Sequence, residues 1–124
     1  IYTLSLHDAL PISTCMAAAD LVICRAGAIT LSEIQAMGKP AILIPSPNVA
    51  ENHQYHNAMA LVNAGAADII EEKDLTGAAL MRKTDKMLLN PEKLEKYSEN
   101  SRKMAITDAN ERIYSVVKKV LGLV

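Results

Sequence analysis

The stretch "LVICRAGAITLSEIQAMGKPAILI", residues 21–44, decides the fold of this chain. An apolar run at 21–24 leads into small residues and a glycine, a helical pattern covers 30–37, and a second apolar run follows at 41–44. Gly38 is placed to end the helix, and Pro40 prevents its continuation. Two short apolar runs joined by a helix are typical of a βαβ unit with parallel strands.

The rest of the chain continues this alternation and then becomes helical. The predicted elements are a loop at 45–52, a helix at 53–64 ended by Gly65, a strand at 67–70, a helix at 76–89 opened by Thr76, a charged and mostly exposed helix at 92–105, and a last helix opened by a capping box of Asp108 and Glu111. On the helix at 53–64 we expect Tyr55 and Met59 to face the core. The pattern predicts an α/β domain in which loops at the carboxyl edge of a parallel sheet bind ligands.

Composition limits the classes of function. The 124 residues suit one domain, half of them are apolar, and the core must be aliphatic because Trp and Phe are absent. A net charge of -1 gives no argument for binding nucleic acid. Two cysteines, Cys15 and Cys24, in an α/β pattern without a secretory signal indicate a reducing compartment. They lack CxxC spacing and no histidine cluster accompanies them, so we expect no metal. No cofactor is expected either.

The first residues stand apart from this pattern. The segment "IYTLSLHDALPIS", residues 1–13, has no basic region followed by a long apolar core, so it is not a signal peptide. It resembles the translated adapter sequence found at the ends of assembled reads. We therefore expect 1–13 to be a non-native leader and 14–124 to be a partial domain from a longer protein.

The loop at 25–29 and the helix after it allow two interpretations. Free backbone N–H groups of Ala28, Ile29 and Thr30, with the helix dipole, suit a phosphate or diphosphate, and Glu33 could accept hydrogen bonds from ribose hydroxyls. Gly27 would allow a positive φ or a close approach of ligand to backbone. Thr30 and Glu33 also match a capping box, which is purely structural, and spacing alone favours that second interpretation. Neither a GxGxxG fingerprint nor a P-loop is present.

Three motifs together carry a family resemblance. The runs "RAGAITLSE" at 25–33, "GKP" at 38–40 and "QYHNA" at 54–58 make residues 19–72 similar to the donor-binding half of the MurG family. These glycosyltransferases add N-acetylglucosamine to lipid I in peptidoglycan synthesis. The resemblance implies a Rossmann-like parallel sheet with helices on both faces, the C-terminal half of a GT-B enzyme whose N-terminal domain is missing here.

The resemblance also implies site residues. Ala28 and Ile29 would contact the nucleotide through their backbone, Thr30 would bind the diphosphate, and Glu33 would hold the ribose hydroxyls. Gln54 would bind the sugar hydroxyls. The implied positions for UDP-N-acetylglucosamine are Ala28, Ile29, Thr30, Leu31, Ser32, Glu33 and Gln54, with Arg25 and Gly27 shaping the loop and His53 beside Gln54. No catalytic residue is expected in this fragment, because the family's proposed base belongs to the N-terminal domain.

The implied function is binding of UDP-N-acetylglucosamine for transfer to lipid I at the cytoplasmic face of the bacterial plasma membrane. Contacts to lipid I and to the membrane surface would come from the missing domain, and the fragment alone is expected to be inactive. One alternative is a stand-alone, non-catalytic donor-binding subunit that needs a membrane partner. Another is a Rossmann-like nucleotide binder without chemistry.

Overall fold

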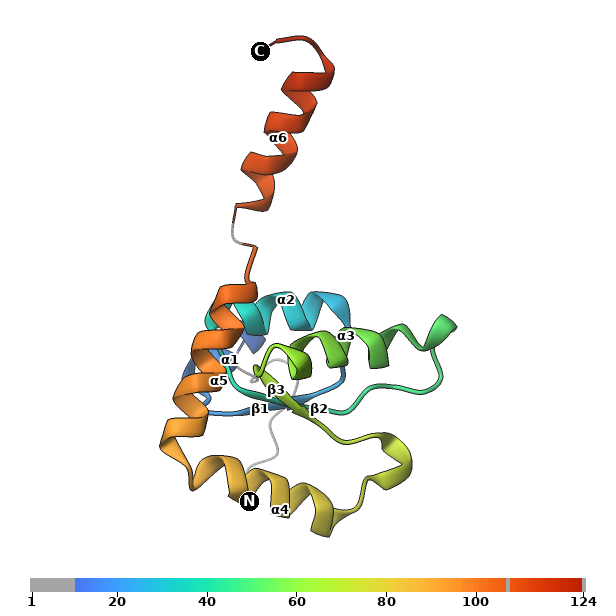
Figure 1. Ribbon diagram of the computed structural model, residues 1–124, viewed down its shortest axis with the longest axis vertical. Helices are drawn as coiled ribbons and strands as arrows, with labels where there is room; N and C mark the ends of the chain where they lie inside the picture. The colour runs from blue at the N-terminus through green and yellow to red at the C-terminus, as the bar shows by residue number, and fades with distance from the viewer. Residues whose placement is uncertain (1–10, 107, 124) are drawn as a thin grey trace.

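A computed structural model describes residues 11–106 and 108–123 and contains a parallel sheet in the order β1-β2-β3. Helices surround this sheet, and α6 stands away from the body (Figure 1). The elements are α1 (Ile12–Ala18), β1 (Val22–Cys24), α2 (Ala28–Met37), β2 (Ala41–Leu43), the 3₁₀ turn η1 (Ala50–Asn52), α3 (His53–Asn63), β3 (Ala67–Ile69), η2 (Glu72–Asp74), α4 (Gly77–Leu88), α5 (Pro91–Met104) and α6 (Ala109–Val120). The predicted strand–helix alternation is confirmed.

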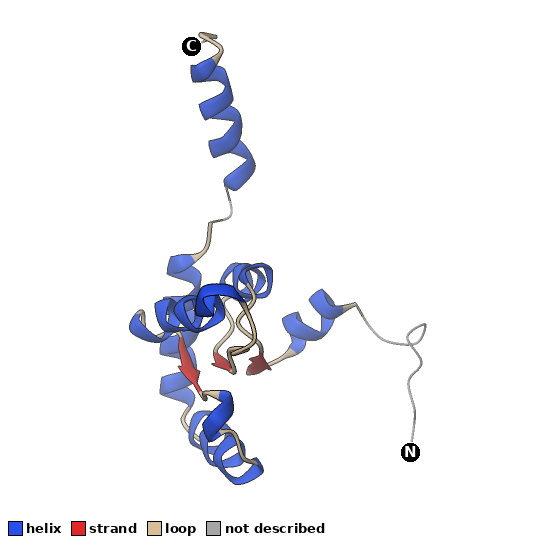
Figure 2. Cartoon of the chain, turned by 90° about the vertical axis from the view of Figure 1, so that its right-hand side faces the viewer, coloured by secondary structure: helices blue, strands red, loops and turns tan. Residues whose placement is uncertain are grey.

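The sheet is covered on both faces, as predicted. β2 is the central strand and is fully buried, and its alternate side chains enter different clusters. Ala41 and Leu43 pack with the apolar residues of α1, α2 and α3, whereas Ile42 packs with Ile70 and Met87 beneath α4 and α5. Figure 2 shows the helices on either side of the strands. The aliphatic core therefore has two layers that hold the strand ends in fixed positions.

Glycines end α2 and α3 in the way the sequence indicates. Gly38 has φ 63°, and the N–H of Lys39 reaches back to the carbonyl of Ile34 at 3.0 Å. Gly65 has φ 70° and follows α3 directly after Ala64. Both glycines occupy the left-handed conformation that side chains disfavour, so each sets the direction in which the chain enters the next strand.

One prediction about the later helices is confirmed and another is wrong in part. Thr76 caps α4 by accepting a hydrogen bond from the N–H of Ala79 at 3.0 Å. Helix α5 is charged as expected, yet one of its faces is packed rather than exposed. Its Ser101 is fully buried, and the Tyr97 hydroxyl donates to Asp68 of β3 at 2.9 Å. Burial and the Asp68 carboxylate raise the pKa of Tyr97 to about 12.

The predicted capping box at α6 is wrong. Asp108 precedes the helix, but its side chain makes no cap and instead pairs with Arg112 at 2.8 Å, which lowers the pKa of Asp108. The apolar stripe of α6 is exposed, from 46% at Val117 to 80% at Val120. Within residues 11–106 and 108–123, no helix has both the length and the apolar character needed to cross a bilayer.

Candidate functional site

The candidate residues gather at the carboxyl edge of the sheet. β1 ends at Cys24, and the chain then forms the loop that enters α2. β2 ends at Leu43 and leads through a Pro-rich loop into α3. This arrangement brings the first turns of α2 and α3 to one edge, as expected for parallel strands with helical connections.

Helix α2 begins two residues earlier than predicted, and this separates the two interpretations of its first turn. Its N-cap is Gly27, which has no side chain to accept a hydrogen bond, and the helix runs from Ala28. Thr30 is therefore the third helical residue and does not cap the helix. The capping box of Thr30 and Glu33 is wrong. The start is set by packing, because Ala26 just before it and Leu31 inside the helix are both buried.

Three backbone donors are left at the start of α2. The first N–H that bonds within the helix is that of Leu31, which donates to the carbonyl of Gly27 at 3.0 Å. The N–H groups of Ala28, Ile29 and Thr30 precede it and have no side-chain cap. Together with the helix dipole they form a donor set for an anion.

One of the two predicted roles of Gly27, a positive φ, is wrong. Its φ is -69°, so it does not use a positive φ. A Cβ built on Gly27 would meet no atom within 4 Å, so the space beside this glycine is open. The structure thus retains only the second predicted reason for glycine, namely the close approach of a ligand to the backbone.

The next residues of α2 divide between the core and the surface. Leu31 is 4% exposed and packs in the core, so its side chain does not share the surface of the other candidates. The Ser32 hydroxyl donates to the carbonyl of Ala28 at 3.0 Å and belongs to the helix itself. Glu33 is exposed, and its carboxylate has no hydrogen bond or ion pair with the described residues. Glu33 is thus available to a ligand one turn beyond the amides.

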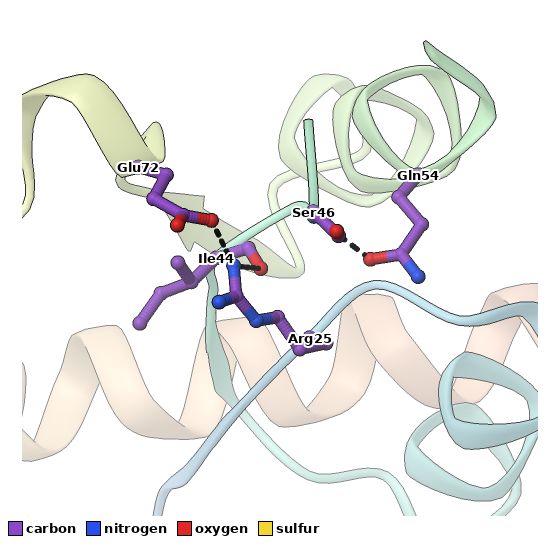
Figure 3. Close-up of polar contacts among 5 residues, drawn as sticks. All are labelled: Arg25, Ile44, Ser46, Gln54 and Glu72. Carbon is purple, nitrogen blue, oxygen red and sulfur yellow. Dashed lines mark hydrogen bonds and ion pairs between the residues drawn. The ribbon is translucent and has the colours of Figure 1, made fainter. Parts of the chain in front are cut away.

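The loop before α2 is anchored at two points. Arg25 donates from Nη1 to the Glu72 carboxylate at 2.7 Å and to the carbonyl of Ile44 at 3.4 Å (Figure 3). Asn57 of α3 donates to the carbonyl of Ala26 at 3.4 Å. The sequence interpretation singled out neither Glu72 nor Asn57. No local signal marks Glu72, whereas Asn57 lies inside the quoted "QYHNA" motif.

Gln54 has a defined amide orientation. Its Oε1 accepts a hydrogen bond from the backbone N–H of Ser46 at 2.9 Å, as Figure 3 shows. The Gln54 amide nitrogen therefore remains as the donor that can face a ligand. His53 lies beside it, and its Nδ1 is 2.9 Å from the carbonyl of Ala50. Because a carbonyl only accepts, that nitrogen carries the proton and Nε2 is left toward solvent.

A cavity of about 480 Å³ lies next to this edge. It is lined by Pro45, Pro47, Asn48, Asn52, Tyr55, Glu71, Glu72 and Lys73. Tyr55 is only half-buried and lines this cavity, so its predicted place in the core is wrong; Ala58 and Leu61 are the buried residues of α3. Glu72 belongs both to this wall and to the contact with Arg25, which connects the cavity with the α2 loop.

Titratable groups other than carboxylates add little chemistry to the edge. Cys24 ends β1, and burial raises the pKa of its thiol to about 11, so the thiol stays protonated near neutral pH. In the part of the chain that the structure describes, no three His, Cys, Asp or Glu side chains form a group that could hold a metal ion. Besides the uncapped amides, this edge carries the exposed Glu33 and Glu72 carboxylates and the Gln54 carboxamide.

Comparison with known proteins agrees with this arrangement of the candidate site. Residues 7–113 match the family described as "Glycosyltransferase family 28 C-terminal domain". The chain belongs to this glycosyltransferase family. The crystal structure of Acinetobacter baumannii MurG superimposes on the family 28 domain with a TM-score of 0.76 at 30% identity, covering 86% of this chain and 30% of that one. The predicted α/β fold and the resemblance to MurG are both confirmed.

Two bacterial relatives share about half of their aligned residues with this chain. The family 28 domain is 53% identical over 104 residues to a protein of Thermoanaerobacter sp. (strain X514) and 50% identical over 106 residues to one of Acetivibrio thermocellus. Both are named UDP-N-acetylglucosamine--N-acetylmuramyl-(pentapeptide) pyrophosphoryl-undecaprenol N-acetylglucosamine transferase. The matches cover 84% and 86% of this chain, which spans 29% of the length of each relative.

Two predictions lie beyond these findings. The ligand contacts assigned to individual residues stay predictions. So does the division into a non-native leader at 1–13 and a domain at 14–124, because residues 1–10 lie outside the described residues. Residues 12 and 13 form the start of α1.

Proposed function

We propose that this chain binds UDP-N-acetylglucosamine as the donor-binding part of an N-acetylglucosaminyltransferase that acts on lipid I. The observation that carries the proposal is the uncapped start of α2, where the amides of Ala28, Ile29 and Thr30 have no side-chain cap and the space beside Gly27 is open. A diphosphate matches these donors in charge and size. The names of the relatives at about 50% identity support the choice of donor and acceptor.

In this proposal Glu33 and Gln54 each bind one part of the donor. Glu33 accepts hydrogen bonds from the two ribose hydroxyls, since its carboxylate has no partner among the described residues. Gln54 donates from its amide nitrogen to an oxygen of the sugar, because Ser46 already occupies its carbonyl oxygen. The donor would therefore be held at its ribose, diphosphate and sugar by groups from two helices.

The same amides also serve the chemistry. Sugar transfer breaks the bond between the anomeric carbon and the diphosphate, so negative charge grows on the leaving diphosphate. Fixed N–H dipoles that already point at this charge stabilise it without reorganisation. No general base is assigned in this chain. We propose that the base, the lipid I contacts and a peripheral attachment to the cytoplasmic membrane face come from the remaining length of such a transferase.

Titration of the ¹⁵N-labelled 124-residue chain with UDP, UDP-N-acetylglucosamine and ADP tests the donor site. We expect weak binding, with the amides of Ala28, Ile29 and Thr30 shifting most and UDP-sugar binding better than ADP. Equal affinity for ADP would argue against a uracil-specific site. Shifts confined to another part of the chain would contradict the proposal.

A substitution at Glu33 tests its role separately. Glu33→Ala should weaken UDP binding by about 1–3 kcal/mol through loss of charged hydrogen bonds. Its thermal stability should be unchanged, because Glu33 takes no part in a helix cap. Glu99→Ala removes another exposed carboxylate, on α5, and should leave UDP affinity as it is. A lower melting temperature with unchanged affinity would mean that Glu33 only stabilises the helix.

An activity assay addresses the transferase itself and its alternatives. The 124-residue chain alone should not transfer N-acetylglucosamine to a lipid I analogue. The chain inserted in place of the matching segment of the Thermoanaerobacter relative should restore transfer. Turnover by the chain alone would refute the donor-fragment proposal, and a chimaera that binds UDP-sugar without transfer would favour a non-catalytic binding subunit.

A further inference from the structure

One arginine connects the ends of all three strands. Arg25 directly follows β1, Ile44 directly follows β2, and Glu72 opens η2 after β3. The Arg25 Nη1 lies 2.7 Å from the Glu72 carboxylate and 3.4 Å from the Ile44 carbonyl oxygen. In Figure 3 the guanidinium lies between these two partners. The carboxyl edge of the sheet is thereby bridged by a single side chain.

We propose that Arg25 and Glu72 form a positioning pair for the donor site, and that Arg25 is not a ligand of the diphosphate. This rests on the proposed function, since it concerns how the α2 amides are held for their ligand. The contact at 2.7 Å is a charge-assisted hydrogen bond, so the Arg25 charge already has a partner. A second, weaker contact to the Ile44 carbonyl holds the guanidinium from the side of β2.

The pair acts on the amides through a very short segment. Only Ala26 separates Arg25 from Gly27, the N-cap of α2. Ala26 is completely buried, and its carbonyl accepts from Asn57 of α3. The segment is thus held toward β3 by the arginine and toward α3 by the asparagine. Displacement of this segment moves the N–H groups of residues 28–30 together. Because these donors must align with an anion, a shift of about 1 Å is enough to weaken ligand binding.

The pair is suited to position the loop rather than to stabilise the fold. The Arg25 and Glu72 side chains are 52% and 41% exposed. Ion pairs with this much exposure contribute little to folding, because water screens them. The pair instead fixes the position of one loop relative to another, since the two partners are 47 residues apart in sequence and lie in separate loops. Loss of the pair should therefore affect ligand binding more than melting temperature.

A direct phosphate contact by Arg25 would make the opposite prediction. If Arg25 left Glu72 to bind the diphosphate, Glu72 would compete with the ligand for the guanidinium. Neutralising Glu72 would then release Arg25 and tighten UDP binding. If the pair positions the loop, the same change loosens the loop and weakens UDP binding. The sign of the Glu72→Gln effect decides between the two.

The experiment compares UDP binding to the 124-residue chain and to its variants, and it adds NMR of the free proteins. Glu72→Gln and Arg25→Gln should each weaken UDP binding about 3–10-fold, and the double variant should be no weaker than the worse single one, as for coupled residues. In the absence of ligand, the amide signals of residues 28–30 should already shift in Glu72→Gln. Glu99→Gln is the control, because Glu99 is an exposed carboxylate on α5 and does not line the cavity beside the loop.

Several results would overturn the proposal that Arg25 and Glu72 position the loop. Tighter UDP binding by Glu72→Gln is one, and UDP affinity that is unchanged in both single variants is another. Unchanged signals for the 28–30 amides in Glu72→Gln would also overturn it. If the unmodified chain is folded but does not bind UDP, the proposed donor site fails, while the amide signals of the free variants still test the pair.

Discussion

A side-chain cap placed on α2 should stabilise the protein and block its ligand. Gly27 is the N-cap of α2, with φ -69° and ψ 143°, and a Cβ there meets nothing within 4 Å. Gly27→Asp therefore fits without strain. Its carboxylate would accept hydrogen bonds from the same first-turn amides that we assign to the diphosphate.

The size of both effects can be estimated. An Asp cap in place of Gly, its favourable charge at the helix start and the loss of glycine flexibility together stabilise by about 0.5–1 kcal/mol. This corresponds to a rise of about 2–8 °C in melting temperature. A carboxylate about 5 Å from a phosphate charge costs roughly 0.8 kcal/mol at a dielectric constant of 80 and roughly 3.3 kcal/mol at 20. UDP binding should weaken about 4- to 270-fold.

Thermal denaturation and UDP titration measure the two effects in the same samples. Gly27→Asn caps the helix without charge and should weaken UDP binding less than Gly27→Asp. Gly27→Ala keeps the amides uncapped and should be the least stable of the three variants. A Gly27→Asp protein that melts higher but binds UDP as well as the unmodified chain would refute the assignment of the diphosphate to this helix start.

Three further predictions follow from single contacts. Gln54→Glu removes the amide donor and adds a charge, so affinity for UDP-N-acetylglucosamine should fall more than affinity for UDP, which is weakened only by the added charge; an equal loss for both ligands would contradict this. Gly38→Ala should lower the melting temperature. The φ of 63° costs a residue with a side chain about 1–2 kcal/mol, and the new Cβ would also lie 2.5 Å from the Arg102 side chain. An unchanged melting temperature would contradict this prediction. Stability should fall as pH rises from about 10 to about 12, because the unfolded chain loses the Tyr97 proton first, and Tyr97→Phe should reduce this fall in melts across that range. An identical pH profile in Tyr97→Phe would show that the contact with Asp68 does not contribute.

The sequence indicated the elements well because their signals are local. An apolar run, a capping residue or a glycine acts within a few positions, and Gly38 and Thr76 end and begin helices as predicted. The candidate amides at 28–30 were also identified, since a glycine before a helix at the end of a strand is a local pattern. The error at Thr30 and Glu33 arose because a chance capping-box spacing lay inside the helix.

What the sequence by itself determined is the order of strands and helices and the presence of a helix start suited to an anion. Tertiary structure alone decided that α2 begins at Ala28, because burial of Ala26 and Leu31 fixes where the chain turns into the helix. It also decided that Arg25 faces Glu72 rather than open solvent. Contacts between residues 47 positions apart depend on how the strands align side by side, and no local pattern of residues specifies that alignment.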